Sequence, residues 1–169
     1  MKKEISSLIN EQINKELFSA YLYIDIADYF AIEGLNGFNN WFYVQAQEER
    51  DHAMLFRAYM LNNDESIKLS AIAAPDQVYA DYKAPLVLTL QHEQTVTASI
   101  NNIYAVAYTE KDFRTMQFLD WFVEEQGEEE KNSTDLIRKY ELFGSDSKGL
   151  YLLDQELATR IYAPPTLVI

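Results

Sequence analysis

The chain has 169 residues, of which 48% are hydrophobic, and its formal net charge at neutral pH is −13. This length suits one domain that buries a sizeable core. The excess of acidic residues argues against nucleic acids and anionic membranes as partners and favours cations. The chain has no cysteine, which excludes disulfides, thiolate zinc sites and iron–sulfur clusters.

The hydrophobic runs bear on localisation. The opening segment MKKEISSLINEQI has two lysines but no sustained apolar stretch, unlike a signal peptide. No run approaches the roughly 18 apolar residues that a membrane-spanning helix requires. We therefore expect a cytoplasmic protein that does not cross a membrane, and the lack of cysteine agrees with a reducing compartment.

Apolar residues recur at spacings of three and four in four long segments, which predicts amphipathic helices. In the first segment, for example, Ile9, Ile13, Ala20 and Phe30 fall on one apolar stripe. No repeat or linker divides the chain, so we expect one domain over residues 1–169. The predicted long helices cover about 4–33, 38–63, 84–110 and 112–143, and a short fifth helix is expected at about 149–162.

The lengths of the connections predict the topology. Only a few residues join the first helix to the second and the third to the fourth, so each pair should form an antiparallel hairpin. Residues 63–83 between the pairs contain Pro75 and show little periodicity. A connection of this length fits a chain that crosses from one end of a bundle to the other. The sequence therefore predicts an all-α four-helix bundle with one long crossover.

Five polar residues lie on the apolar stripes, where core residues are expected. Glu16 is on the first helix, Glu49 and His52 are on the second, Glu93 is on the third and Glu129 is on the fourth. Burying ionised carboxylates without compensation is strongly unfavourable. Carboxylates that converge in a core need a shared cation to neutralise them. The pattern predicts a metal site inside the bundle.

The types of ligand indicate which metal the site prefers. Glu49 and His52 are three residues apart on one helix face, and Gln126 and Glu129 repeat that spacing on the fourth helix. Oxygen ligands with few nitrogens suit a pair of iron or manganese ions better than copper, although zinc would also bind. Carboxylates stabilise the oxidised metal, so Fe²⁺ would give up an electron there, and open coordination positions would admit dioxygen. His92 lies off the stripe and is expected to be an ordinary surface histidine.

Motifs with a specific order and spacing cover essentially the whole chain: INEQINKELFSAYLY, QAQEERDHA, QHEQ, WFVEEQGEEEK and GLYLLDQEL. With them the chain resembles the non-haem ferritins of the prokaryotic type. The resemblance implies a ferritin-like four-helix bundle with a short fifth C-terminal helix. It also implies a ferroxidase that oxidises Fe²⁺ with O₂ or H₂O₂ and stores ferric mineral inside a homo-oligomeric cage of 24 subunits.

The resemblance also implies roles for the residues on the stripes. Glu16, Glu49 and His52 resemble the ligands of the first iron of a di-iron centre. Glu49, as a bridge, resembles a ligand of the second iron together with Glu93 and Glu129.

Further positions match the same family. Gln126 matches a glutamine beside the second iron, and Tyr23 matches a tyrosine thought to supply an electron during oxidation. Glu48, Glu125 and Glu128 match a third iron position that shares a ligand with the paired centre.

Departures from related families refine the expectation. Bacterioferritins carry a second Glu-x-x-His motif where this chain has Gln126-x-x-Glu129, and a haem-binding methionine where it has Arg50. We therefore expect no haem. Animal ferritins have an acidic pair for iron uptake at positions that hold Met116 and Leu119 here, so the resemblance does not assign a route for iron entry.

The aromatic content bears on assembly, and two alternatives to a storage cage stay open. Twelve tyrosines and nine phenylalanines exceed the needs of one bundle core, and the off-stripe residues Tyr21, Leu22, Tyr29 and Tyr43 suggest subunit contacts.

The first alternative to a storage cage is a small di-iron oxidase or peroxidase that forms no cage. The second is an acidic helical bundle without metal chemistry, against which the carboxylates on the stripes argue.

Overall fold

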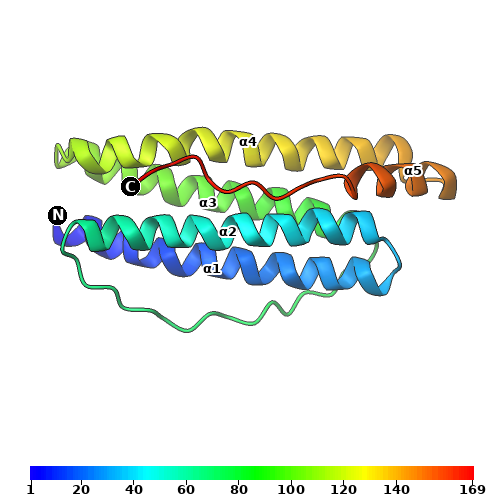
Figure 1. Cartoon of the computed structure of the whole chain (residues 1–169), viewed down its shortest axis with the longest axis horizontal. Helices are drawn as coiled ribbons and strands as arrows, with labels where there is room; N and C mark the ends of the chain where they lie inside the picture. Colours follow the sequence, from blue (N-terminus) through cyan, green and yellow to red (C-terminus); the bar gives the residue numbers. More distant parts are fainter.

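The computed structural model describes all residues from 1 to 169 and contains helices but no strand (Figure 1). The predicted all-α class is confirmed. None of the helices has the length and hydrophobicity needed to cross a membrane. The helices are α1 (Lys3–Ile32), α2 (Asn36–Asn62), α3 (Lys83–Thr109), α4 (Phe113–Phe143) and α5 (Ser147–Leu157).

The four long helices form two antiparallel hairpins that lie side by side (Figure 1). α1 packs along α2, α3 packs along α4, and the two hairpins meet partly through α1 and α3. The turn between α1 and α2 contains Gly34 at φ 79°, a backbone conformation that glycine adopts without strain. Asp112 begins α4 by accepting a hydrogen bond from the backbone N–H of Thr115.

Residues 63–82 connect the hairpins and run along the length of α1 (Figure 1). Asn10 exchanges two hydrogen bonds with the backbone of Lys68, at 2.9 and 2.8 Å. Near the other end of α1, the Tyr79 hydroxyl donates to Asp25 at 2.8 Å. These contacts fix an extended segment to the helix, and they realise the predicted crossover from one end of the bundle to the other.

The hydrophobic core consists of two clusters separated by a polar layer. One cluster contains Ile9, Phe56 and Phe122, and the other contains Phe30 and Phe42. The layer between them supplies most of the buried polar side chains of the protein. Its members include Gln12, Glu16, Ser19, Gln45, Glu49, His52, Glu93, Gln126 and Glu129.

α5 begins two residues before the predicted start and ends five residues before the predicted end at 162. It begins early because the Asp146 side chain accepts hydrogen bonds from the N–H groups of Lys148 and Gly149. It ends early because Asn40 of α2 donates to the carbonyls of Leu157 and Arg160, at 3.3 and 3.0 Å. Beyond α5 the chain is extended and runs back along the bundle, shown in red in Figure 1.

α5 is docked on the first turn of α2. The buried side chain of Asp154 accepts hydrogen bonds from the N–H groups of Gly37 and Phe38, at 2.7 and 3.1 Å. No side chain of the preceding loop caps α2, so Asp154 satisfies N–H groups that have no partner inside the helix. A Cβ atom on Gly37 would lie only 1.6 Å from the backbone oxygen of Asp154, so this contact requires glycine.

Two of the aromatic and aliphatic residues predicted to make subunit contacts are used inside the chain instead. Leu22 is buried in the second core cluster, because α1 presents more than one stripe to its neighbours. The Tyr29 ring packs against the Tyr79 ring of the crossover, with centroids 4.9 Å apart. Tyr21 and Tyr43 are exposed, as a role in contacts with other subunits requires.

Candidate metal centre

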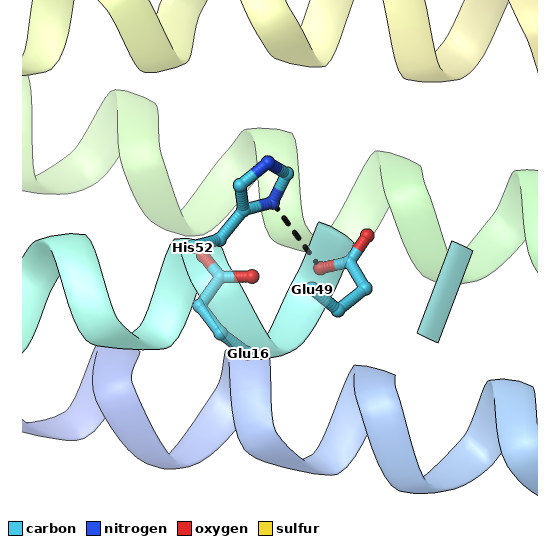
Figure 2. Close-up of side chains that lie close together, drawn as sticks. All are labelled: Glu16, Glu49 and His52. Carbon is cyan, nitrogen blue, oxygen red and sulfur yellow. Dashed lines mark ion pairs between the residues drawn. The ribbon is translucent and has the colours of Figure 1, made fainter. Parts of the chain in front are cut away.

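Glu16 of α1 and Glu49 and His52 of α2 converge in the polar layer (Figure 2). Each offers one ligand atom, and these atoms all lie within 4.8 Å of one another. His52 Nδ1 lies 3.5 Å from a carboxylate oxygen of Glu49. The spacing of three residues places Glu49 and His52 on one face of α2, and α1 brings Glu16 to that face.

A second group of possible ligands adjoins the first through His52. His52, Glu125 and Glu129 also place one ligand atom each within 4.8 Å of one another. Glu125 is half-buried, whereas His52 and Glu129 are buried. α4 therefore supplies carboxylates to the side of the site that faces α2.

Glu93 of α3 is buried in the same layer but bonds to other side chains. It accepts a hydrogen bond from the Tyr23 hydroxyl, and the Gln126 amide donates to it at 3.2 Å. Its negative charge raises the pKa of both Glu49 and Glu129. Tyr23, Glu93 and Gln126 thus form a hydrogen-bonded unit beside the two groups of ligand atoms.

The buried glutamates have strongly perturbed acidities. Burial raises the pKa of Glu16 well above its usual value, and the neighbouring charge of Glu49 raises it further. Burial is also the main cause of the raised pKa of Glu49, Glu93 and Glu129. No lysine or arginine forms an ion pair with any of the four. A divalent cation would supply the missing positive charge.

Two atoms at the centre of the site lack a hydrogen-bond partner although they are buried. They are Oε2 of Glu16 and Nδ1 of His52. Buried polar atoms of proteins nearly always have a partner, so these two require an explanation. Both belong to residue types that bind transition metals, and both lie in the group around Glu49. The donor set therefore fits a divalent metal.

Two glutamines hold the carboxylates in place, and the sequence pattern predicted no role for either. Gln12 donates to Glu16 at 2.8 Å, and Gln45 donates to Glu129 at 2.6 Å and to Glu49 at 3.4 Å. Hydrogen bonds of this kind orient metal ligands. Each glutamine precedes a glutamate of its own helix by four residues, and this spacing was the signal available in the sequence.

The residues predicted for a third iron position do not all converge. Glu125 faces His52, with 3.9 Å between its carboxylate oxygen and Nε2. Glu48 instead forms an ion pair with Arg160, and Glu128 is exposed.

His92 is not the surface histidine that its off-stripe position predicted. Its Nε2 lies 2.7 Å from the Ser19 hydroxyl, and its ring packs against the rings of Phe18 and Tyr23. Burial lowers its pKa to about 4, so the imidazole is neutral at physiological pH. Contacts with these α1 side chains account for the difference, and Ala71 and Ala73 of the crossover line the same surface hollow as His92.

Comparisons with known proteins agree with the fold. The profile of one protein family, described as a ferritin-like domain, matches residues 6–143. The bacterial non-heme ferritin of Campylobacter jejuni is 36% identical over 155 residues, which are 92% of this chain and 93% of the relative. The bacterial non-heme ferritin of Staphylococcus aureus is 34% identical over 162 residues, which are 96% of this chain and 98% of the relative.

Solved structures give the same result. The open-pore ferritin of Archaeoglobus fulgidus matches with a TM-score of 0.93 and 39% identity over 95% of this chain and 99% of the other. A closed form engineered from the ferritin of that organism matches with a TM-score of 0.94 and 39% identity over 96% of this chain and 99% of the other. Because the family profile matches residues 6–143 and the relatives match over nearly the full length, the chain belongs to the ferritin family.

Proposed function

We propose that this protein oxidises Fe²⁺ with O₂ or H₂O₂ at a carboxylate-bridged pair of metal positions and stores the ferric product inside a 24-subunit cage. Membership of the ferritin family and the ferritin fold support iron storage and ferroxidase activity in general. The buried, acidic polar layer supports the more detailed proposal.

One observation carries the proposal: four glutamates and one histidine are buried together without any cationic partner from the protein. In the proposed arrangement, Glu16, Glu49 and His52 bind the first Fe²⁺. Glu49 then bridges to a second Fe²⁺ bound by Glu93 and Glu129. The position of Glu49 supports the bridge. Its charge raises the pKa of Glu16 on α1, and the charge of Glu93 on α3 raises the pKa of Glu49.

The proposed reaction balances with two Fe²⁺ ions. Each ion gives up one electron, and the two electrons with two protons convert one O₂ to H₂O₂ or one H₂O₂ to two molecules of water. Carboxylate ligands favour the product because they stabilise Fe³⁺ more than Fe²⁺. Tyr23 donates a hydrogen bond to Glu93, which would accept the phenolic proton when Tyr23 gives up an electron. With that electron and one more from a third Fe²⁺, four electrons and four protons would convert one O₂ to two molecules of water.

Apolar side chains on the surface support assembly. Ile32 is 84% exposed and Tyr108 and Phe113 are each 70% exposed in the single chain, in addition to Tyr21 and Tyr43. Exposed large apolar side chains of this kind are available for contacts between subunits. The number of 24 subunits and the cytoplasmic location are expected from the resemblance to ferritins of the prokaryotic type.

The experiment compares oxygen consumption after addition of two Fe²⁺ per subunit to the parent protein and to Glu49→Ala. Loss of the proposed bridge is expected to slow the initial rate by about 100-fold or more, in the range found for loss of essential catalytic groups. Glu124→Ala is the matched control, because it removes the same type of side chain from an exposed position on α4. Its rate should equal that of the parent.

An unchanged rate in Glu49→Ala would refute the bridge. The particle mass of the same parent sample, measured by light scattering, separates the two di-iron hypotheses. A mass of one or two subunits together with rapid iron oxidation would instead favour the small oxidase or peroxidase that forms no cage.

A further inference from the structure

The extended tail, residues 158–169, follows α5 and places an arginine at the rim of the metal centre. Arg160 Nη1 donates to Gln45 Oε1 at 2.8 Å and to the Trp41 carbonyl at 3.2 Å. Its Nη2 lies 2.5 Å from Glu48 Oε2, and its guanidinium stacks 4.5 Å above the Trp41 ring. Contacts of this number and geometry hold the arginine in one orientation.

Further contacts fix the tail along α2 and α4. The Tyr162 hydroxyl donates to Asp51 of α2, and Trp121 Nε1 of α4 donates to Thr166 Oγ1 at 3.1 Å. Leu167 packs against the first core cluster. The Trp121 ring itself lies 5.6 Å from the ring of His52, so the tail passes directly beside the metal centre.

Arg160 holds a carboxylate on the face of α2 that carries His52. Glu48 precedes His52 by four residues and so shares its helix face, and Nε2 of that histidine lies 3.9 Å from a carboxylate oxygen of Glu125 on α4. That residue already lies within 4.8 Å of ligand atoms on His52 and Glu129. In this structure the positive charge beside Glu48 is the guanidinium.

We propose that Arg160 competes with a third divalent metal ion for Glu48, so that the C-terminal tail sets the occupancy of a position beside Glu125 and Glu129. This inference rests on the proposed metal centre and concerns its regulation by a segment of the chain outside the bundle. The guanidinium occupies Oε2 of Glu48, and its positive charge repels a cation at either oxygen of that carboxylate. The third ion therefore binds more tightly when the contact between Arg160 and Glu48 breaks.

Arg160 is a positioning residue, because it also orients a side chain that touches two ligands. It donates to the oxygen of the Gln45 amide, so the amide nitrogen faces Glu129 and Glu49. A purely structural role of Arg160 would depend on the contacts of both guanidinium nitrogens, which lysine cannot reproduce. Competition for Glu48 depends on positive charge, which lysine retains. Arg160→Lys and Arg160→Gln therefore separate the two roles.

The test measures equilibrium binding of Zn²⁺, which is redox-inert, to the assembled parent and to its variants. Arg160→Gln is expected to bind the third Zn²⁺ about tenfold more tightly, as the loss of a competing charge-assisted hydrogen bond implies, while the first two ions bind as in the parent. Arg160→Lys should stay near the parent. Lys139→Gln is the matched control, because Lys139 lines the same surface hollow as Arg160 but pairs with Glu156.

Equal affinity for the third ion in the parent and Arg160→Gln would overturn the proposal. So would an equal gain in Lys139→Gln, which would show a general effect of charge, or matching gains in the lysine and glutamine variants, which would show a structural effect. Failure of the parent to bind even a tight pair of ions would instead count against the proposed metal centre itself.

A second measurement needs no change at Arg160. The protein has two tryptophans, so Trp121→Phe leaves Trp41, stacked under the guanidinium, as the sole indole fluorophore. Displacement of Arg160 is expected to change Trp41 fluorescence as the third Zn²⁺ binds, and adding Glu48→Gln should abolish this change. Constant fluorescence while the third ion binds would contradict the displacement of Arg160.

Discussion

Glu49 lies at the centre of the site, and its two carboxylate oxygens have different neighbours. One is 3.4 Å from the Gln45 amide nitrogen, and the other is 3.5 Å from Nδ1 of His52. Its negative charge also raises the pKa of Glu16, which faces it from α1. A carboxylate whose two oxygens face different neighbours and have no lysine or arginine partner suits a bridge between two cations.

The raised pKa values of the buried glutamates predict how the stability of the metal-free protein depends on pH. In the folded protein Glu16, Glu49, Glu93 and Glu129 keep their protons to higher pH than in the unfolded chain, whose glutamates titrate near 4.5. Folding therefore takes up protons above that pH, and the free energy of unfolding falls as pH rises toward neutrality. Urea unfolding of the metal-free protein at a series of pH values measures this slope.

Other acidic residues contribute repulsion over the same pH range, so a matched pair of variants isolates the buried groups. Glu16→Gln removes a buried carboxyl and should flatten the slope, whereas Glu124→Gln removes an exposed one and should change it little. Saturating Zn²⁺ should reverse the trend in the parent, because metal binding requires deprotonated ligands. Equal slopes in the two variants would show that the buried glutamates are not the cause.

At the scale of the elements, the periodicity predicted the ends of the four long helices to within two residues and those of the short α5 less well. Each long helix carries an apolar stripe that extends over many turns, and this local signal does not depend on the rest of the fold. The end of α5 depends on Asn40 of α2, which is more than 100 positions away in the sequence. Contacts of that kind cannot be predicted from local periodicity.

Two glycines in helices allow a prediction about element stability. Gly127 lies in the middle of α4, is exposed, and has open space where a Cβ would be placed. Gly127→Ala should therefore raise the free energy of unfolding by about 1 kcal/mol, because alanine loses less backbone entropy in a helix. Chemical denaturation of the metal-free protein measures this change.

Gly37→Ala is the contrasting variant, since its new Cβ would overlap the backbone of Asp154. It should destabilise the protein and loosen the docking of α5 on α2. A gain of stability in Gly37→Ala, or a loss in Gly127→Ala, would contradict the packing described for these two helices.

At the scale of the whole molecule, the sequence predicted which side chains gather at the site but not what surrounds them. The residues on the apolar stripes of four helices were expected to converge, because a bundle brings all such stripes to one axis. Gln12 and Gln45 were missed because amides on a stripe also fit ordinary core hydrogen bonds. Arg160 was missed because its tail has no periodicity, and only the folded chain brings it to Glu48.

The same limit explains the error at His92. Its position off the α3 stripe was correct, but an extended crossover carries no signal that shows which helix face it covers. The hydrogen bonds of Asn10 and Tyr79 place that segment over α1, and two of its alanines, Ala71 and Ala73, line the same hollow as the histidine.

The most direct test of the central claim locates iron in the protein by anomalous X-ray diffraction at the iron edge, from crystals soaked anaerobically in Fe²⁺. Two strong peaks are expected inside the bundle. One should lie among Glu16, Glu49 and His52, and the other between Glu49 and the carboxylates of Glu93 and Glu129. Iron bound only at exposed acidic residues, with no peak in the polar layer, would contradict the account.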